Sequence, residues 1–357
     1  MENDLLTYLK NYKNQSLNEL PFNEVDALIF ASLSYPKFDE ILGIVDTYSN
    51  EEILTLINDF NQTSLSDRKK LNIALLKEVC ESKRFEGIKL FHYRKSMNKD
   101  ISKQFQAVSF MMDDLIIVSF CGTDGTTTGW KEDLNMSYLE LTPSEIEAMN
   151  YLKEINELYH EKSLILVGHS KGGRLVVSSA KYMQNKDKIK EIYTFDAPNY
   201  ANDFYDEEYQ KIESKIYSYV PEESIIGRLI NEPRNPIIVK SKNSLIQQHD
   251  ISSWCVIDNH LVEVESGYSK QSTKISKALN GTLERYDNKT KKEFSDIVFG
   301  FIDRLDIHEF KSKEENLILL KQSIKYVPKE WKNTPKEDRA LLKTILFRMI
   351  KDYIFGN

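Results

Sequence analysis

The sequence is poor in cysteine, with only Cys80, Cys121 and Cys255 among its 357 residues. Three is an odd number, and no two of them are close in the chain. This argues against a framework of disulfide bonds and against the paired ligands of a structural zinc site. Proteins of a reducing compartment have this kind of composition, so we expect a cytoplasmic location.

Long hydrophobic runs and an excess of basic residues are also missing. No apolar run approaches the roughly 18 residues that cross a bilayer, and residues 1–4 are polar and acidic rather than the start of a signal peptide. The chain has 48 lysines and arginines against 55 aspartates and glutamates, a formal net charge of −7. Because nucleic-acid binding depends on basic side chains that neutralise phosphates, we expect no nucleic-acid partner.

The sequence has instead the alternating pattern of an α/β protein. Apolar, β-branched runs at 115–120, 164–167 and 190–195 predict strands, and periodic apolar residues at 144–160 and 171–183 predict amphipathic helices. Strands that alternate with helices form a mainly parallel sheet with helices on both faces. With 41% hydrophobic residues, the chain has enough apolar surface for a sizeable core.

Both ends of the chain are predicted to be helical. Residues 4–80 repeat apolar side chains three and four apart, before a first strand at 88–93. From residue 269 the chain becomes charged, with lysines interleaved with glutamates and two periodic apolar segments. We predict a main α/β domain over 1–268, which includes the N-terminal helices, and a helical extension or cap over 269–357 that packs on it.

One hexapeptide, GHSKGG at residues 168–173, follows the predicted strand 164–167 and opens the predicted helix 171–183. A strand, a sharp turn with serine at its tip and a helix are the layout of a nucleophile elbow. Such a turn presents Ser170 to a base on one side and to backbone N–H donors on the other. The alternative is an ordinary strand–helix turn that happens to hold a serine.

A second turn provides candidate oxyanion donors. The predicted strand 115–120 runs into CGTDG at residues 121–125, where Thr123 offers a backbone N–H and a hydroxyl. The other donor would be the backbone N–H of Lys171, the residue after the nucleophile. Taken alone, the turn would be an ordinary glycine-bearing β-turn; together with the elbow it predicts an oxyanion hole.

These motifs resemble the class 3 lipase group of α/β-hydrolases, in particular its bacterial Mbeg-like branch. The resemblance extends over about residues 20–262 and rests on FCGT at 120–123, Trp130 with Asp133, GHSKGG at 168–173, TFDAPN at 194–199, a segment at 21–35, and QHD at 248–250 followed by Trp254. It implies an α/β-hydrolase fold and a serine-dependent ester hydrolase of the lipase or esterase type. It also implies that Asp133 supports the turn at residues 121–125 that carries the candidate oxyanion donor Thr123.

The chain departs from the class 3 pattern in three places. Cys121 stands where arginine is usual, and Asp196 stands where glycine is usual. The later loop that usually carries the aspartate of the triad reads EESII at residues 222–226. The acid of the triad is therefore left open between several carboxylates.

The base of an α/β-hydrolase is a histidine that follows the serine in the chain. Among the six histidines, His92, His160, His169 and His308 are set aside because they precede the serine, adjoin it or lie in the helical tail. His249, in the polar loop QQHD, and His260, at a hairpin turn, remain. We predict His249, because such a base belongs in a loop at the end of a strand, and His260 is the alternative.

The acid has to hold the histidine in its correct tautomer. Asp196 directly follows the predicted strand 190–195 and precedes a turn with proline. Glu222 and Glu223 follow the next predicted strand. We predict Asp196, with Glu223 or Glu222 as the alternative acid and Asp250 as a further candidate.

The expected protein is a serine hydrolase that cleaves carboxylic esters through an acyl-enzyme and needs neither a metal nor an organic cofactor. The family resemblance implies a small-molecule ester or lipid as substrate, such as a glycerolipid or lysophospholipid, and is compatible with transient contact with a membrane surface. Two alternatives stay open. One is an acyltransferase or amidase with the same triad, and the other is a non-catalytic binding module with a hydrolase fold.

Overall fold

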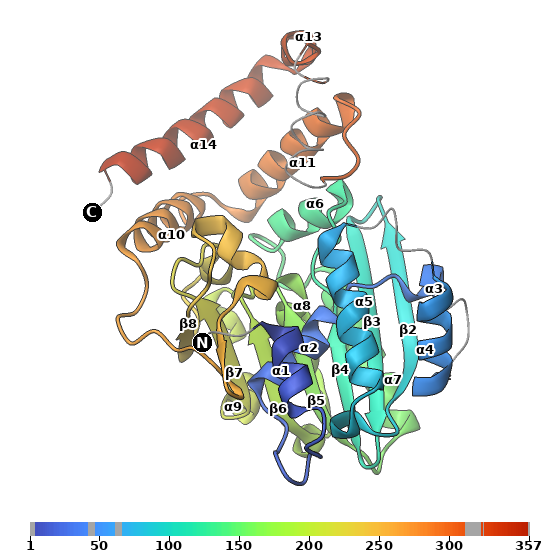
Figure 1. Ribbon diagram of the computed structural model, residues 1–357. Helices are drawn as coiled ribbons and strands as arrows, with labels where there is room; N and C mark the ends of the chain where they lie inside the picture. Colours follow the sequence, from blue (N-terminus) through green and yellow to red (C-terminus); the bar gives the residue numbers. More distant parts are fainter. Residues whose placement is uncertain (1–3, 42–46, 61–65, 311–322, 324, 356–357) are drawn as a thin grey trace.

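The computed structural model describes residues 4–41, 47–60, 66–310, 323 and 325–355. Within these residues an eight-stranded sheet runs through the molecule, and its strands follow one another in chain order (Figure 1). The strands are β1 (Thr47–Ser49), β2 (Lys89–Asn98), β3 (Lys103–Met112), β4 (Leu115–Phe120), β5 (Ser163–His169), β6 (Ile189–Phe195), β7 (Ile216–Pro221) and β8 (Pro236–Val239).

The direction of strand pairing in the sheet changes at β4. Strands β1 to β4 pair antiparallel, whereas β4 to β8 all pair parallel. Parallel neighbours need crossover connections, and helices supply them. The predicted fold class, an α/β-hydrolase fold with a mainly parallel sheet and helices on both faces, is confirmed.

The predicted first strand at 88–93 is shorter than the strand in the structure and is not the first. Strand β2 continues to Asn98, and β1 precedes it and pairs with its beginning. The register of β2 with β3 shifts between Phe91 and Arg94, where His92 has a φ of 54°. Such a bulge inserts an extra residue and interrupts the alternation of apolar and polar side chains. For this reason the strand predicted from that alternation ends before the strand in the structure does.

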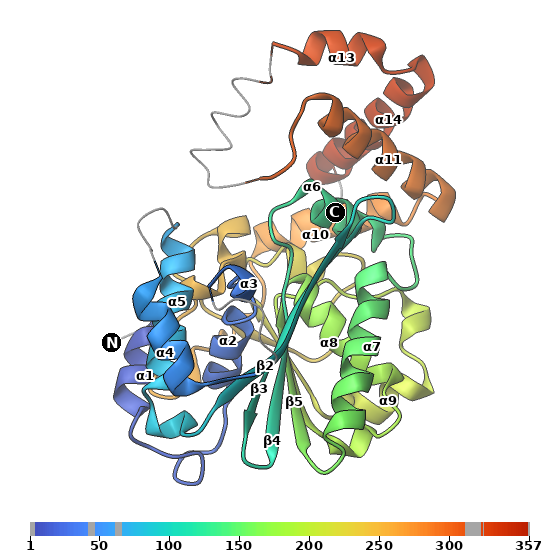
Figure 2. The ribbon, with the colours of Figure 1, turned by 90° about the vertical axis from the view of Figure 1, so that its right-hand side faces the viewer.

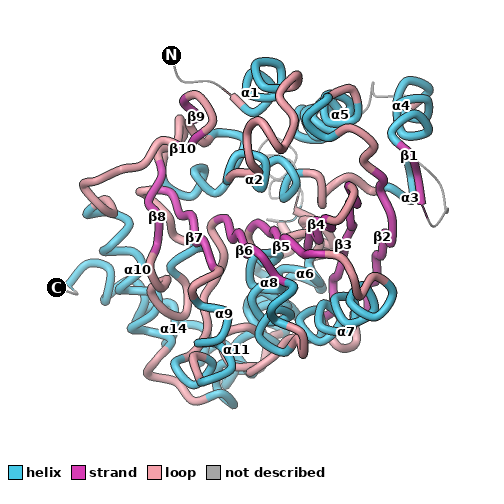
Figure 3. Tube along the Cα trace, turned by 90° about the horizontal axis from the view of Figure 1, so that it is seen from below, coloured by secondary structure: helices cyan, strands magenta, loops and turns pink. Residues whose placement is uncertain are grey.

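Helices cover both faces of the sheet (Figure 3). One face is covered by α1 (Leu5–Tyr12), α2 (Glu24–Ser32), α4 (Asn50–Asp59) and α5 (Asp67–Cys80), with the short α3 (Phe38–Ile41) nearby. The other face is covered by α7 (Pro143–Leu158), α8 (Lys171–Tyr182) and α9 (Glu207–Glu213). Each face has its own apolar core, which explains why the central strands are apolar on both sides.

A further group of helices lies beyond the edge of the sheet where the parallel strands end (Figure 2). It consists of α6 (Thr127–Asn135), α10 (Lys270–Leu283), α11 (Asn288–Arg304), α13 (Val327–Asn333) and α14 (Lys336–Phe355). Phe294, Leu342 and Ile345 form a small third core there, and Leu134 of α6 packs against it. The division into domains at residue 268 stays a prediction.

A hairpin of β9 (Val256–Ile257) and β10 (His260–Leu261) stands apart from the main sheet. Among the helices that the structure describes, none is long and apolar enough to cross a bilayer.

Candidate active site

Ser170 lies at the tip of the turn between β5 and α8. Its φ of 57° and ψ of −132° are unusual for a residue with a side chain, and its N–H donates to the carbonyl of Phe195 on the neighbouring strand, at 2.9 Å. A Cβ on Gly168 would overlap the backbone of Gly172, and a Cβ on Gly172 would overlap that of Phe120. Only glycine therefore allows strand and helix to pack so closely around the serine.

Three predicted side chains form one hydrogen-bonded series. The Nε2 atom of His249 lies 2.9 Å from Oγ of Ser170, and its Nδ1 atom lies 2.6 Å from Oδ2 of Asp196. His249 is the last residue of a short 3₁₀ helix, Leu245–His249, and Asp196 directly follows β6 with a φ of 46°. The structure thus brings Ser170, His249 and Asp196 together, in the order that a nucleophile, a base and its orienting acid require.

The carboxylate of Asp196 is fixed on its other side as well. Its Oδ1 atom accepts hydrogen bonds from the hydroxyl of Ser224, at 2.5 Å, and from the N–H of Gly227, at 3.0 Å. The side chain is buried, where an ionised carboxylate is tolerated only with such partners. The donors come from the loop after β7, which is the loop where the class 3 pattern would place the acid itself.

The alternative candidates have other roles in the structure. Glu223 accepts from the N–H of Leu245, at 2.8 Å, and so holds the segment that carries His249. Glu222 contributes through its backbone, which pairs with Val239 and Ser269. Neither of these contacts involves the imidazole of His249.

The last two alternatives also have partners outside the triad. Asp250 caps the next 3₁₀ helix through Ser252, whose N–H and hydroxyl donate to it at 3.1 and 2.8 Å. The side chain of His260 is 66% exposed, and its Nδ1 lies 2.9 Å from a carboxylate oxygen of Glu24. Neither residue is placed to assist Ser170.

The candidate oxyanion donors lie beside the serine. A Cβ added to Gly122 would come within 3.1 Å of the Cβ of Ser170, which places the Gly122–Thr123 turn against the elbow. The hydroxyl of Thr123 donates to Oδ2 of Asp133 at 2.6 Å. Its only proton is therefore already used, and the backbone N–H of Thr123 is the donor that remains for an oxyanion.

The side chain of Lys171 lies in a buried polar cluster that the sequence did not indicate. Its Nζ atom donates to the carbonyl and side-chain oxygens of Gln104, at 2.7 and 2.6 Å, and to Oε2 of Glu132, at 3.0 Å. Glu132 also accepts from the N–H and hydroxyl of Ser144, at 2.8 and 2.7 Å. A buried ion pair is tolerated when its remaining hydrogen bonds are made, as they are here.

Helix α6 therefore supports both candidate donors with two consecutive acids. Glu132 holds Lys171, and Asp133 holds Thr123. Burial raises the pKa of Asp133 to about 6, although the charge of Lys171 and the hydrogen bond from Thr123 oppose this. The second carboxyl oxygen of Asp133 is buried and has no hydrogen-bond partner among the residues that the structure describes, which adds to the cost of its ionised form.

A second histidine, His169, lies behind the base. Its Nε2 is 2.8 Å from the backbone carbonyl of His249, and its Nδ1 is 2.6 Å from the hydroxyl of Tyr35. A carbonyl only accepts, so Nε2 carries the proton and Nδ1 accepts from the tyrosine. Burial and the neighbouring His249 lower the pKa of His169 well below its usual range, so this ring is a neutral support.

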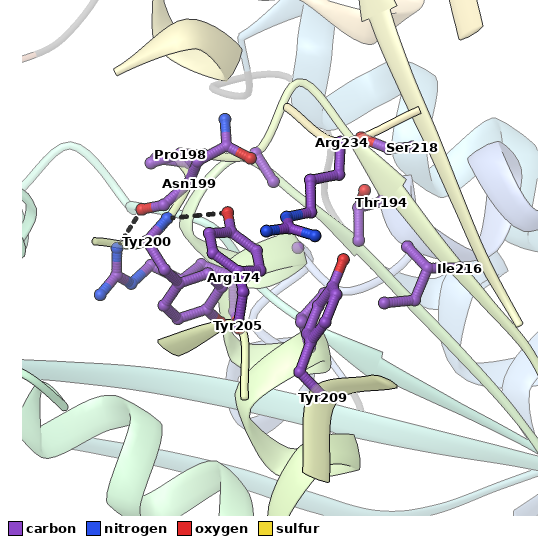
Figure 4. Close-up of a pocket in the computed structure, with 13 residues that line it drawn as sticks. Arg174, Thr194, Pro198, Asn199, Tyr200, Tyr205, Tyr209, Ile216, Ser218 and Arg234 are labelled. Atoms are coloured by element: carbon purple, nitrogen blue, oxygen red, sulfur yellow. Dashed lines mark hydrogen bonds between the residues drawn. The ribbon is translucent and has the colours of Figure 1, made fainter. Parts of the chain in front are cut away.

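Among the residues that the structure describes, one cavity includes the candidate base and another borders the segment that follows Asp196. His249 lines an open hollow of about 390 Å³, together with Arg68, Asn243, Ile246, Gln247 and Asp250, which gives the candidate base access to solvent. The other is a cavity of about 30 Å³ lined by Arg174, Tyr205, Tyr209 and Arg234 among others (Figure 4). It has room for a water molecule but not for an organic substrate.

A search of curated proteins finds no match. Solved structures that are similar include a fungal lipase–inhibitor complex described as a model for interfacial activation, at 12% identity over 61% of this chain and 78% of that one, with a TM-score of 0.39. Another is the lipase of Rhizopus microsporus var. chinensis, at 15% identity over 59% and 83%, with a TM-score of 0.34.

A further solved structure that is similar is the Lip2 lipase of Yarrowia lipolytica, at 10% identity over 60% of this chain and 77% of that one, with a TM-score of 0.36. The model of the Mbeg1-like family matches residues 79–300, which is more than half of the chain and includes Ser170, Asp196 and His249. The chain belongs to the Mbeg1-like family.

Proposed function

We propose that this protein is a serine hydrolase that cleaves carboxylic esters through an acyl-enzyme. The observation that carries the proposal is the hydrogen-bonded series from Asp196 through His249 to Ser170, at 2.6 and 2.9 Å, on a strained strand–helix turn. A serine becomes a useful nucleophile only beside a base, and a histidine becomes an oriented base only beside a third group. Both conditions are met by this arrangement.

The geometry supports a definite sequence of proton movements. Asp196 accepts only, so Nδ1 of His249 carries a proton and Nε2 is free to take the proton of Ser170 as its Oγ attacks the ester carbonyl. Asp196 stabilises the imidazolium, and the backbone N–H groups of Thr123 and Lys171 stabilise the oxyanion. The imidazolium then gives its proton to the leaving alcohol. A water activated by His249 releases the acid from the serine in the same way.

The first substrates to examine are esters of glycerolipids or lysophospholipids, because the motifs of the chain resemble class 3 lipases. The hollow beside His249 supports an ester with a polar group near the reacting carbonyl, since it is lined by Arg68, Asn243, Gln247 and Asp250 as well as by Ile246. Transient contact with a membrane surface and a cytoplasmic location belong to the same proposal.

The direct test is hydrolysis of a short-chain p-nitrophenyl ester. Ser170→Ala and His249→Ala are each expected to lower kcat by a factor on the order of 10³ or more without loss of folding. His260→Ala, which changes an exposed histidine, is the matched control and should retain activity. Full activity in His249→Ala with loss in His260→Ala would contradict the proposed base. Repeating the assay with an added alcohol acceptor and with amide substrates separates hydrolysis from acyl transfer and amide cleavage.

A further inference from the structure

A short segment after α11, residues 308–310, pairs with the loop that follows Thr123. The N–H of Thr127 donates to the carbonyl of His308 at 3.0 Å, and the N–H of Phe310 donates to the carbonyl of Gly125 at 2.7 Å. Thr126 and Glu309 are partners in an antiparallel β-bridge between these two bonds. The segment therefore holds the loop on both sides of Thr126, although the two lie far apart in the sequence.

The pairing provides a hydrogen-bond acceptor for a backbone N–H at the start of α6. Thr127 is the first residue of α6, and an N–H in the first turn of a helix has no acceptor within the helix. His308 provides the acceptor, and Thr127 also donates its hydroxyl to the same carbonyl at 3.2 Å. Gly125 has a φ of +93°, and a Cβ there would come within 2.6 Å of the carbonyl oxygen of Phe310. The backbones pack at a distance that requires glycine.

The contacts of α11 with α6 continue the same attachment. Lys131 forms an ion pair with Asp296 at 2.8 Å, and the hydroxyl of Ser295 donates to Asn135 at 2.8 Å in a buried position. The ring of Phe310 meets Trp130 edge to face, with the ring centroids 6.3 Å apart. Figures 1 and 2 show α11 beside α6 in both views. The helix that supports both candidate oxyanion donors is thus held from its outer side by the C-terminal part of the chain.

We propose that residues 308–310 are a positioning segment for the oxyanion loop, here defined as residues 121–126. By pairing with Gly125 and Thr127, the segment fixes the stretch between the donor Thr123 and the start of α6, so that the N–H of Thr123 keeps its direction toward the oxyanion that forms when Ser170 attacks the carbonyl carbon. The catalytic consequence rests on the proposed serine hydrolase function. The structural consequence, an ordered loop, does not.

The test compares two substitutions at one position. Phe310→Pro removes the N–H that bonds to Gly125, whereas Phe310→Ala keeps this N–H and removes only the ring on Trp130. Phe310→Pro is expected to lower kcat for a p-nitrophenyl ester by about 10- to 100-fold with KM within about twofold, because a donor is misplaced only with respect to the transition state. Hydrogen exchange at the amide of Thr127 should become faster in the same variant. Phe310→Ala should have a clearly smaller effect on both.

A second variant keeps the proposal testable if Phe310→Pro does not fold. Thr126 and Glu309 form the non-hydrogen-bonded kind of antiparallel pair, whose Cα atoms lie about 4.5 Å apart, within the range of a disulfide. Thr126→Cys combined with Glu309→Cys therefore allows the pairing to be locked and released in one protein. Oxidation should slow exchange at the Thr127 amide and leave kcat equal to or above that of the reduced form.

The outcomes separate this proposal from the proposed function. Faster exchange at Thr127 in Phe310→Pro with an unchanged kcat would overturn the catalytic role of the segment, and unchanged exchange would overturn its structural role. A fall in kcat of more than tenfold on oxidation of the cysteine pair would also overturn it, since the segment would then have to leave the loop during turnover. Failure of the serine hydrolase function would appear differently, as an inactive wild-type protein whose exchange at Thr127 still responds to Phe310→Pro.

Discussion

At the scale of single residues, two members of the candidate triad have unusual backbone conformations. Ser170 and Asp196 have φ values of 57° and 46°, in a region of backbone conformation that residues other than glycine disfavour. The surrounding contacts maintain them: Ser170 donates its N–H to Phe195, and Asp196 donates its N–H to Tyr219. Strain maintained by the neighbouring structure is characteristic of functional sites.

The triad acid gives the first prediction. Asp196→Asn preserves the shape of the side chain but offers an amide N–H where His249 needs an acceptor, which favours the wrong imidazole tautomer. The expected loss in kcat is about 10⁴-fold, by analogy with the same change in a serine protease. Glu223→Gln is the matched control, because this glutamate holds the segment of His249 without touching the ring. A large loss in Glu223→Gln with a mild effect of Asp196→Asn would reverse the assignment.

Asp133 gives a prediction about pH. Its pKa in the folded protein is raised to about 6 from an ordinary 3.8, so the folded state favours the protonated form. Protonated Asp133 therefore contributes its full share to the free energy of unfolding below pH 3.8, and this share is lost as the pH rises through 6. The free energy of unfolding changes by about 3 kcal/mol in total. Asp133→Asn removes this titration and keeps an oxygen for Thr123.

The measurement is urea unfolding of the wild type and of Asp133→Asn between pH 4 and pH 7.5. The free energy of unfolding of the wild type should fall relative to that of the variant over this range. A difference that does not change with pH would show that the pKa of Asp133 is not raised. Salt can be added against precipitation near the isoelectric point. It should leave the titration of Asp133 nearly unchanged, because this side chain is buried and salt screens mainly exposed charges.

The residues of the candidate triad were within reach of sequence reasoning, whereas most of the residues that support them were not. Ser170 is marked by a motif, His249 follows from chain order among six histidines, and Asp196 stands directly after a strand. Glu132 carries no such mark, and Tyr35 stands out only as the end of the segment 21–35 that carries the family resemblance, which assigns it no role. The bond of Tyr35 to His169 joins residues 134 positions apart, and no spacing in the sequence predicts a contact of that kind.

At the scale of elements, the close packing of β5 on α8 determines the shape of the site. Gly168→Ala is expected to lower the free energy of unfolding by about 3 kcal/mol or more, because its Cβ would overlap backbone atoms that cannot move away. Gly281→Ala is the matched control: a Cβ there meets nothing within 4 Å, and in helix α10 the change should stabilise by about 0.5–1 kcal/mol. Chemical unfolding of both variants measures the two effects. Equal stability of the two variants would contradict the role of Gly168.

The central elements were also the most predictable. Strands β4, β5 and β6 and helices α7 and α8 lie where apolar runs and helical periodicity predicted them, because burial on both sides makes these segments apolar throughout. The antiparallel edge was less accessible. A bulge after Phe91 and the three-residue strand β1 are set by tertiary contacts rather than by a local pattern.

At the scale of the whole molecule, the C-terminal helices have a core of their own, separate from the two cores on the faces of the sheet. Ile345 is buried in it, whereas its neighbour Leu346 is half exposed. Ile345→Ala is expected to cost about 2–5 kcal/mol of local stability, and Leu346→Ala should cost little. Hydrogen exchange in α11 and α14 should rise in the first variant only, while β5 stays protected. Equal acceleration in β5 would mean that the molecule unfolds as one unit.

The sequence predicted that these helices pack on the main domain but not where they contact the candidate active site. The pairing of residues 308–310 with the oxyanion loop joins positions about half the chain apart, and it is made by backbone atoms, which leave no signature in residue type. Gly125 is the residue in the loop whose type reflects this pairing. It could not predict the pairing, because glycine is common in turns of every type, whether or not another segment packs on them.

The central claim is that Ser170 is an activated nucleophile, and its most direct test is covalent labelling with a fluorophosphonate. Such a probe reacts with a serine that is activated by a neighbouring base and that lies beside hydrogen-bond donors able to stabilise the developing oxyanion. Mass spectrometry of the digested protein should find the phosphonyl adduct on Ser170, with labelling abolished in Ser170→Ala and strongly slowed in His249→Ala. A folded wild-type protein that remains unlabelled at Ser170 would contradict the account and leave this fold as a binding module.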